Sequence, residues 1–162
     1  MDKIWAPWRS NYIFNKIDEE GCILCNRLKE KEDKKNHILY RGKKSFVIMN
    51  IFPYNNGHLM VAPFKHTAEL EDLESEEGRE LFETLTLGIK ILKISLNPDG
   101  FNIGMNLGKV AGAGIEDHLH IHIVPRWNGD TNFMPVVAET KIISCSLDEV
   151  YNLLKKTLES LL

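Results

Sequence analysis

The chain has 162 residues, of which 43% are hydrophobic, and this predicts a single domain with its own core. Its net charge of -3 lacks the basic excess of most nucleic-acid binders, so we expect no nucleic-acid partner. No apolar run is long enough to cross a membrane, and the first residues, MDKIWAPWRS, contain no apolar signal core. These features predict a cytoplasmic protein with no membrane partner.

Two segments precede the expected core. Residues 1–13 contain two tryptophans and a tyrosine and read as an irregular aromatic arm, and residues 25–37 read as a charged helix or loop. Cys22 and Cys25 form a Cys-x-x-Cys pair between them. Three cysteines in the whole chain do not make a secreted disulfide framework, so the pair indicates metal binding, redox chemistry or chance.

The next elements are two strands and a long helix. Residues 43–52 and 57–63 are strand-like and are joined by the turn cluster PYNN. Ser75 is a candidate cap for the helix that follows, and Asn97-Pro98-Asp99-Gly100 stops this helix. One face of the helix carries apolar residues at helical spacing: Leu81, Leu85, Ile89 and Leu92.

Two further strands and a second helix complete the chain. Residues 101–106 and 118–124 read as strands, with the glycine-rich loop GKVAGAG between them. The sequence SLDE at 146–149 is a capping box that opens a C-terminal helix with an apolar stripe. The order of strands and helices predicts an α+β fold with an antiparallel sheet.

The stretch HLHIHI, residues 118–123, places three histidines at alternate positions. On a strand, His118, His120 and His122 share one face, and the apolar residues between them share the other. Such a row is compatible with surface histidines on an edge strand, with a metal site formed by the run itself, or with nucleophilic catalysis. Neutral imidazole can attack phosphorus, and the glycine-rich loop just before the strand offers amides that can approach phosphate oxygens.

Two motifs resemble the histidine triad (HIT) superfamily. HLHIHIVP resembles its signature of three histidines separated by apolar residues, and NIFPYNNGHLMVAPFKH resembles its upstream segment. The phrases IWAPWRSNYI and GFNIGMNLGKVAGAGI are similar to a bacterial and archaeal branch grouped with fragile-histidine-triad hydrolases and diadenosine tetraphosphate phosphorylases.

The resemblance implies a HIT-like antiparallel sheet with one long helix packed on it and a C-terminal helix. It implies a single domain, residues 1–162, in three parts. These are an N-terminal arm with a zinc-binding segment (1–37), the HIT core (38–127), and a C-terminal extension with a helix (128–162).

The resemblance also assigns roles to individual residues. His120 corresponds to the nucleophile, which attacks an α-phosphorus and forms a covalent nucleotidyl-histidine intermediate. His122 would bind phosphoryl or bridging oxygens, and His58 would support the catalytic histidines. The nucleotide-binding residues would be Ile48 at the base, Asn50 at the ribose, and Asn106, Gly112, Gly114 and His122 near the phosphates.

The implied function is nucleotide hydrolysis or nucleotidyl transfer. Dinucleoside polyphosphates such as diadenosine tetraphosphate, or nucleoside phosphoramidates, are the expected substrates. Eukaryotic-type hydrolases of the superfamily carry a Gly-Gln-Ser/Thr step where this chain has GAGI, so Ala113 and Gly114 replace polar side chains. This leaves a diadenosine polyphosphate phosphorylase, with orthophosphate as acceptor, as one alternative. A zinc-stabilised nucleotide-binding interaction module with little turnover is an alternative of another class.

A structural metal site is also implied by resemblance. In relatives such as galactose-1-phosphate uridylyltransferases, the first triad histidine joins two cysteines and one upstream histidine around a metal. Carried over, this gives Cys22, Cys25, His66 and His118 as ligands of a structural Zn²⁺, with no organic cofactor. The alternative is a pair of small buried cysteines in a turn. Histidine triad relatives are commonly homodimers, so the resemblance implies a homodimer that binds a small-molecule nucleotide.

Overall fold

The computed structural model describes residues 20–131, 137 and 142–162. The aromatic arm expected at 1–13 lies outside these residues. The elements are α2 (Ile23–Glu30), β1 (Ile38–Arg41), β2 (Ser45–Met49), β3 (Leu59–Pro63), α3 (Ser75–Leu96), β4 (Gly100–Gly104), β5 (Ile121–Arg126) and α5 (Leu147–Leu161), with 3-10 turns at Leu70–Asp72 and Lys109–Ala111.

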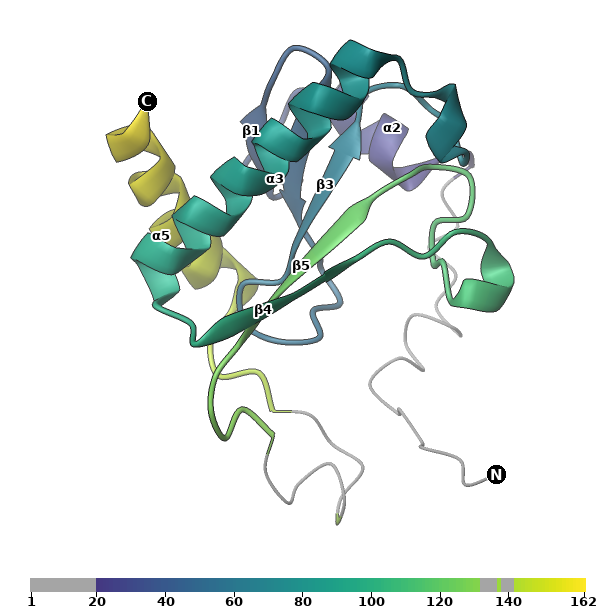
Figure 1. Ribbon diagram of the computed structural model, residues 1–162. Helices are drawn as coiled ribbons and strands as arrows, with labels where there is room; N and C mark the ends of the chain where they lie inside the picture. The colour runs from purple at the N-terminus through teal and green to yellow at the C-terminus, as the bar shows by residue number, and fades with distance from the viewer. Residues whose placement is uncertain (1–19, 132–136, 138–141) are drawn as a thin grey trace.

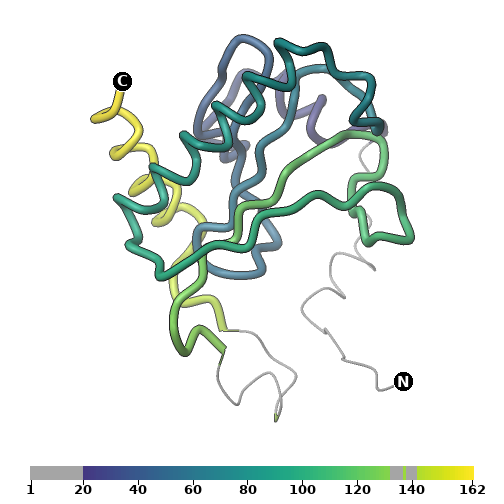
Figure 2. The backbone as a smooth tube through the Cα atoms, in the orientation of Figure 1, coloured from purple at the N-terminus to yellow at the C-terminus, as the bar shows by residue number. Residues whose placement is uncertain are grey.

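The strands form one five-stranded sheet in the order β1-β2-β3-β5-β4, and every neighbouring pair is antiparallel. This confirms the α+β class and the HIT-like antiparallel sheet. Strand β1 was not expected from the sequence. Figure 2 shows β4 and β5 running side by side, joined at one end by the long loop that contains the glycine-rich segment.

Helices cover both faces of the sheet (Figure 1). The long helix α3 crosses one face with α5 beside it, and the short helix α2 lies on the opposite face. The apolar side chains separate into two clusters because strand residues alternate between the faces. The α3 cluster includes Val47, Val61, Leu85, Ile121, Ile123 and Leu154, and the α2 cluster includes Leu24, Ile38, Phe46, Ile48 and Met60.

Helix α3 begins one residue earlier than a Ser75 cap would place it. Glu74 is the cap residue and Ser75 is already helical, so the expectation for Ser75 was wrong. The Glu74 backbone N–H donates to Glu77 Oε2 at 2.9 Å. Glu77 also places negative charge in the first turn, as expected at the positive end of the helix dipole. Deeper in the helix, a Cβ on Gly88 would come within 2.9 Å of Ile123 Cδ1, so glycine lets α3 lie close against β5.

Helix α5 has the expected capping box, in which Ser146 Oγ accepts from the Glu149 N–H. Its side chains also occupy the outer edge of the sheet at β1. The Tyr151 hydroxyl donates to Ile38 O at 3.2 Å, and Lys155 Nζ donates to Leu39 O at 3.0 Å. Within the described ranges, no helix is long and apolar enough to cross a membrane.

Candidate active site and metal cluster

The histidine row lies at the start of β5 and not wholly within it. The strand begins at Ile121, so His118 and His120 precede it, because Leu119 N–H donates to Thr67 O and not to a neighbouring strand. The imidazoles of His120 and His122 nevertheless lie edge to face with ring centroids 4.8 Å apart. His122 is opposite Met60 on β3, and Met60 is opposite Ile48 on β2. This cross-sheet row lies on the face that α2 covers.

The local chain fixes the proton of His120. Its Nδ1 lies 2.9 Å from His118 O, and since a carbonyl only accepts, Nδ1 must carry the proton. The Nε2 atom of the neutral ring then keeps its lone pair. Burial lowers the pKa of His120, and only the hydrogen bond to His118 O opposes this shift, so the neutral form prevails at pH 7. A neutral imidazole with one defined lone pair is a nucleophile.

A second chain of hydrogen bonds fixes His122. The Tyr54 backbone N–H donates to His58 Nδ1 at 3.1 Å, so the proton of His58 must lie on Nε2. That Nε2–H donates to His122 Nδ1 at 2.9 Å, which places the His122 proton on its own Nε2. Burial first, and then His122 and His120, lower the pKa of fully buried His58 to about 3. His58 is therefore a neutral donor that makes His122 a hydrogen-bond donor.

A pocket of about 470 Å³ opens beside these histidines. Of the residues predicted to bind nucleotide or to act in catalysis, Ile48, Asn50, Gly112, Gly114, His120 and His122 line it. Asn50 Oδ1 accepts from the Phe52 N–H at 2.8 Å, so the Asn50 amino group is the end of the amide that can donate to a ligand. His58 lies behind the pocket, where its ring stacks on Tyr54 at 4.8 Å between centroids.

The glycine-rich loop meets the pocket with fewer donors than expected. Gly112 lies in the left-handed region at φ 89°, and its N–H donates within the loop to Lys109 O at 2.9 Å. No protein acceptor for the Gly114 N–H is found in the described part of the chain. Asn106 does not line the pocket, and its amide donates to Gly112 O at 3.4 Å. Asn106 thus stabilises the loop by a hydrogen bond. The Gly114 N–H is better placed than the Gly112 N–H to donate to a ligand.

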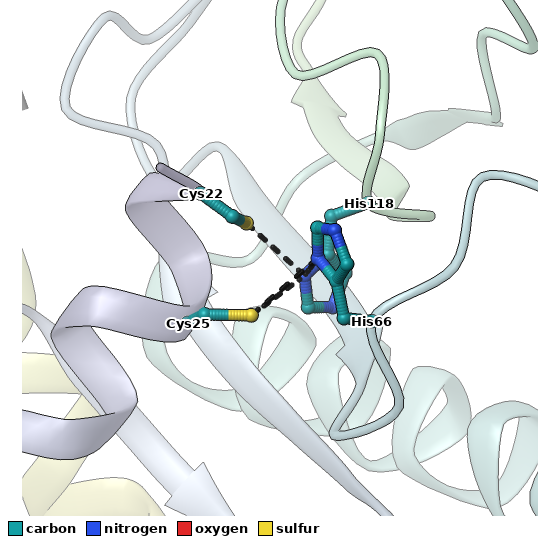
Figure 3. A group of neighbouring side chains, drawn as sticks. All are labelled: Cys22, Cys25, His66 and His118. Carbon is teal, nitrogen blue, oxygen red and sulfur yellow. Dashed lines mark hydrogen bonds between the residues drawn. The ribbon is translucent and has the colours of Figure 1, made fainter. Parts of the chain in front are cut away.

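The four residues expected to bind metal converge at one point, although they come from three separate segments (Figure 3). One ligand atom from each of Cys22, Cys25, His66 and His118 lies within 4.8 Å of all the others. His118 Nδ1 is 3.3 Å from Cys22 Sγ, 3.5 Å from Cys25 Sγ and 3.4 Å from His66 Nδ1. Tetrahedral zinc with its usual bond lengths requires about 3.6 Å between sulfur and nitrogen and about 3.3 Å between nitrogens.

The surroundings of the cluster also suit a cation. His118 Nε2–H donates to Pro63 O at 2.9 Å, and His66 Nε2 faces Asp117 Oδ2 at 3.7 Å, so both rings present Nδ1 to the centre. Metal-binding histidines usually have such an outer hydrogen-bond acceptor. Burial and then the neighbouring Cys22 raise the pKa of Cys25 to about 11, so a pair of thiolates here requires a cation between them.

Several contributors were not found from the sequence. Tyr54 had been assigned only to a turn, yet its backbone sets the tautomer of His58. Pro63 and Asp117 hold the two cluster histidines, and Arg27 lines the pocket. Tyr54 and Pro63 act through backbone atoms, which every residue type has, so the sequence gives no signal for them. Asp117 acts through its side chain, and its position next to His118 could have indicated its role.

This fold and arrangement of histidines define a histidine triad protein, and comparison with known proteins agrees. The family model described as HIT domain matches residues 31–129. The crystal structure of a Zn-bound histidine triad family protein from Mycobacterium smegmatis superposes with a TM-score of 0.71 at 27% identity, covering 87% of this chain and 95% of that one. The chain belongs to the HIT family.

The curated relatives include enzymes with two different names. A Mycobacterium tuberculosis protein named AP-4-A phosphorylase is 36% identical over 161 residues, which cover 95% of this chain and 83% of that relative. A Saccharomyces cerevisiae protein named bis(5'-adenosyl)-triphosphatase is 32% identical over 91 residues, which cover 56% of this chain and 44% of that relative.

Proposed function

We propose that this protein transfers a nucleotidyl group from dinucleoside polyphosphates, with His120 as the nucleophile. The observation that carries the proposal is the pair of fixed tautomers in the pocket: His120 Nε2 has a lone pair, and the adjacent His122 Nε2 has a proton. One ring can attack the α-phosphorus while the other donates to the oxygen that leaves. The names of the two curated relatives, both of which denote cleavage of dinucleoside polyphosphates, support this substrate class.

The steps follow from these positions. His120 Nε2 forms a bond to the α-phosphorus, the bond from that phosphorus to the bridging oxygen breaks, and the remaining polyphosphate leaves with the electron pair. His122 stabilises the departing oxygen by hydrogen bonding. An acceptor oxygen then attacks the same phosphorus, and His120 is released with its lone pair restored. Such transfer depends mainly on positioning and on stabilised oxygens.

Water and orthophosphate are the two candidate acceptors, and orthophosphate would make the protein a phosphorylase. The loop before the triad has GAGI in place of polar side chains, and the Gly112 N–H is already used inside the loop. The small side chains of GAGI leave room at this position, and the Gly114 N–H, which has no acceptor in the described part of the chain, can donate to a phosphate acceptor. The relative named AP-4-A phosphorylase matches nearly the full length of the chain and favours this candidate.

The two acceptors are separated by the products of diadenosine tetraphosphate. Hydrolysis gives AMP and ATP whether or not orthophosphate is present, whereas phosphorolysis gives ADP and ATP only when it is present. We expect ADP to appear with orthophosphate. Absence of cleavage under both conditions would leave phosphoramidates as substrates or the binding module as the function.

We infer further that Cys22, Cys25, His66 and His118 hold a structural Zn²⁺. The ligand spacing and the outer partners of both histidines support this, as does the Zn-bound relative of known structure. Four protein ligands leave no open position, so the ion would hold α2 onto the sheet and take no part in the reaction.

We also propose a homodimer joined through the outer edge of β4. This strand pairs only with β5 among the described strands, and Asn102, Ile103 and Gly104 are exposed along it. The opposite edge, at β1, is occupied by side chains of α5. Exposed edges pair readily, so β4 is the side on which a second copy would extend the sheet.

A further inference from the structure

One side of helix α2 faces the metal cluster, and another side faces the pocket. Its eight residues run from the metal cluster, where Cys22 and Cys25 face His118, toward β1. Leu24 is buried under the middle of the helix. On the flank away from Cys25, Ile23 and Arg27 are one turn apart and both line the pocket. A basic side chain therefore lies in the wall of the proposed nucleotide site.

Backbone contacts place the Arg27 turn of α2 beside β1. The Arg27 carbonyl accepts from Asn36 Nδ2 just before β1, and the next carbonyl, of Leu28, accepts from Arg41 on β1. His120 lies just before β5 and His122 lies within it, and β5 is three strands away from β1 in the sheet order, about 14 Å at the usual strand spacing. With the α-phosphate at His120, as the proposed function has it, and the ribose at Asn50 after β2, as expected from the sequence, the nucleobase would extend toward β1 and Arg27.

The Arg27 guanidinium interacts electrostatically with Glu30, one turn further along α2, but forms no ion pair with it, so its N–H groups remain for a ligand. Within the described part of the chain, no carboxylate, carbonyl or amide accepts a hydrogen bond from the guanidinium, although the side chain is half-buried. Leu24 and Ile48, which pack with Ile38 of β1, also line the pocket and are apolar, so they can cover the faces of a base. They cannot bind its polar edge, and Arg27 is the group in this wall that can.

We propose that Arg27 donates two hydrogen bonds to O6 and N7 of a guanine base and makes the site prefer guanine nucleotides. This rests on the proposed function, because the α-phosphate at His120 sets the direction of the nucleotide. The planar fork of arginine matches the two adjacent acceptors on guanine. Adenine offers one acceptor and one donor at the same edge, so it leaves one guanidinium N–H unpaired and opposes another.

The test is the affinity of the purified, metal-containing protein for GMP, AMP and ribose 5-phosphate, measured by calorimetry. Arg27→Met keeps an apolar stem and removes the guanidinium, and Arg27→Lys keeps the charge but not the fork. We expect the wild type to bind GMP about tenfold or more tightly than AMP, and both variants to lose most of this preference. Lys90→Met, which removes one exposed cation on α3, is the matched control and should keep it.

Several results of this experiment would contradict the inference. Wild-type affinity for GMP no higher than for AMP would do so, as would an equal loss of GMP and AMP binding in Arg27→Met. If ribose 5-phosphate is lost equally as well, Arg27 binds phosphate. Binding needs no turnover, so a guanine preference without cleavage of dinucleoside polyphosphates would overturn the proposed function alone. Failure of all three ligands to bind the wild type would overturn both.

Discussion

Two protons decide what His120 and His122 can do in the proposed reaction. One lies on His120 Nδ1 because His118 O accepts from it, and the other lies on His122 Nε2 because His58 occupies the Nδ1 side. Both assignments begin at the backbone, at His118 O and at the Tyr54 N–H. Reactivity at this site is therefore set by main-chain positions that hold neutral rings in a single tautomer.

His58 makes folding sensitive to acid. Its pKa is about 3 in the folded protein, against about 6.5 when unfolded. Between these values the imidazole is protonated in the unfolded chain and neutral in the folded one. Stability from His58 is full above pH 6.5 and is lost as the pH falls toward 3. We expect His58→Gln to reduce the dependence of the unfolding free energy on pH by as much as about 1.4 kcal/mol per pH unit in this range.

Urea unfolding at pH 4, 5, 6 and 7 measures this difference. Metal loss in acid affects the wild type and the variant alike, so comparing the two slopes isolates His58. Equal slopes would show that His58 is protonated in the folded protein, and the proposed tautomers would then be wrong.

The histidine row shows how far sequence reasoning reaches at single residues. Alternation predicted that His118, His120 and His122 would share one face of a strand. His120 and His122 line the same pocket, whereas His118 precedes β5 and belongs to the metal cluster. The tautomers could not be predicted, because they depend on Tyr54 and His118 backbone atoms brought close by folding. The grouping of Cys22, Cys25, His66 and His118 came from family resemblance and not from spacing.

At the scale of elements, α2 joins the two parts of the site. Its cysteines belong to the metal cluster, while Ile23 and Arg27 belong to the pocket wall. An eight-residue helix is too short to be stable by itself, so its position depends on what holds it. Loss of the proposed Zn²⁺ should therefore weaken nucleotide binding without any change in the sheet residues that line the pocket.

Cys25→Ser tests this coupling, because a hydroxyl is a much poorer zinc ligand than a thiolate. We expect less than about half an equivalent of zinc per chain, a lower unfolding temperature, and nucleotide affinity reduced about tenfold or more. Elemental analysis, thermal unfolding and calorimetry measure the three effects. Cys145→Ser removes an exposed cysteine outside the cluster and should change none of them. A full equivalent of zinc in Cys25→Ser would exclude the four-ligand site.

The helices were easier to predict than the strands. The apolar spacing of α3 and the SLDE box of α5 are local signals, and both helices formed as expected. Strand β1 was missed because HILYR follows a charged run and does not alternate, as Ile38 and Leu39 are buried on opposite faces. Glu74 replaced Ser75 as the cap, because both residues at this boundary have oxygen acceptors and sequence does not choose between them.

At the scale of the whole molecule, the described residues leave one edge of the sheet open and block the other. Side chains of α5 occupy carbonyls of β1, while β4 exposes Ile103 with 46% of its surface accessible. Sequence alone did not give this arrangement, because strand order depends on pairings between distant segments such as β3 and β5. The open edge is the basis for the proposed dimer.

Ile103→Lys should convert the protein from dimer to monomer, since charge on an edge strand opposes pairing. Sedimentation velocity of the wild type and the variant over a range of concentrations measures this. Ile94→Lys places the same charge at an exposed apolar position on α3 and should remain dimeric. A monomeric wild type, or a dimeric Ile103→Lys, would show that β4 is not the interface.

Trapping of the covalent intermediate tests the central claim most directly. The protein would be mixed with diadenosine tetraphosphate, quenched within one turnover, digested and analysed by mass spectrometry. We predict an adenylyl group on His120, and none in His120→Ala, which should still bind nucleotide and keep its zinc. Cleavage of the substrate with the adenylyl group on another residue, or turnover by His120→Ala at the wild-type rate, would contradict this account.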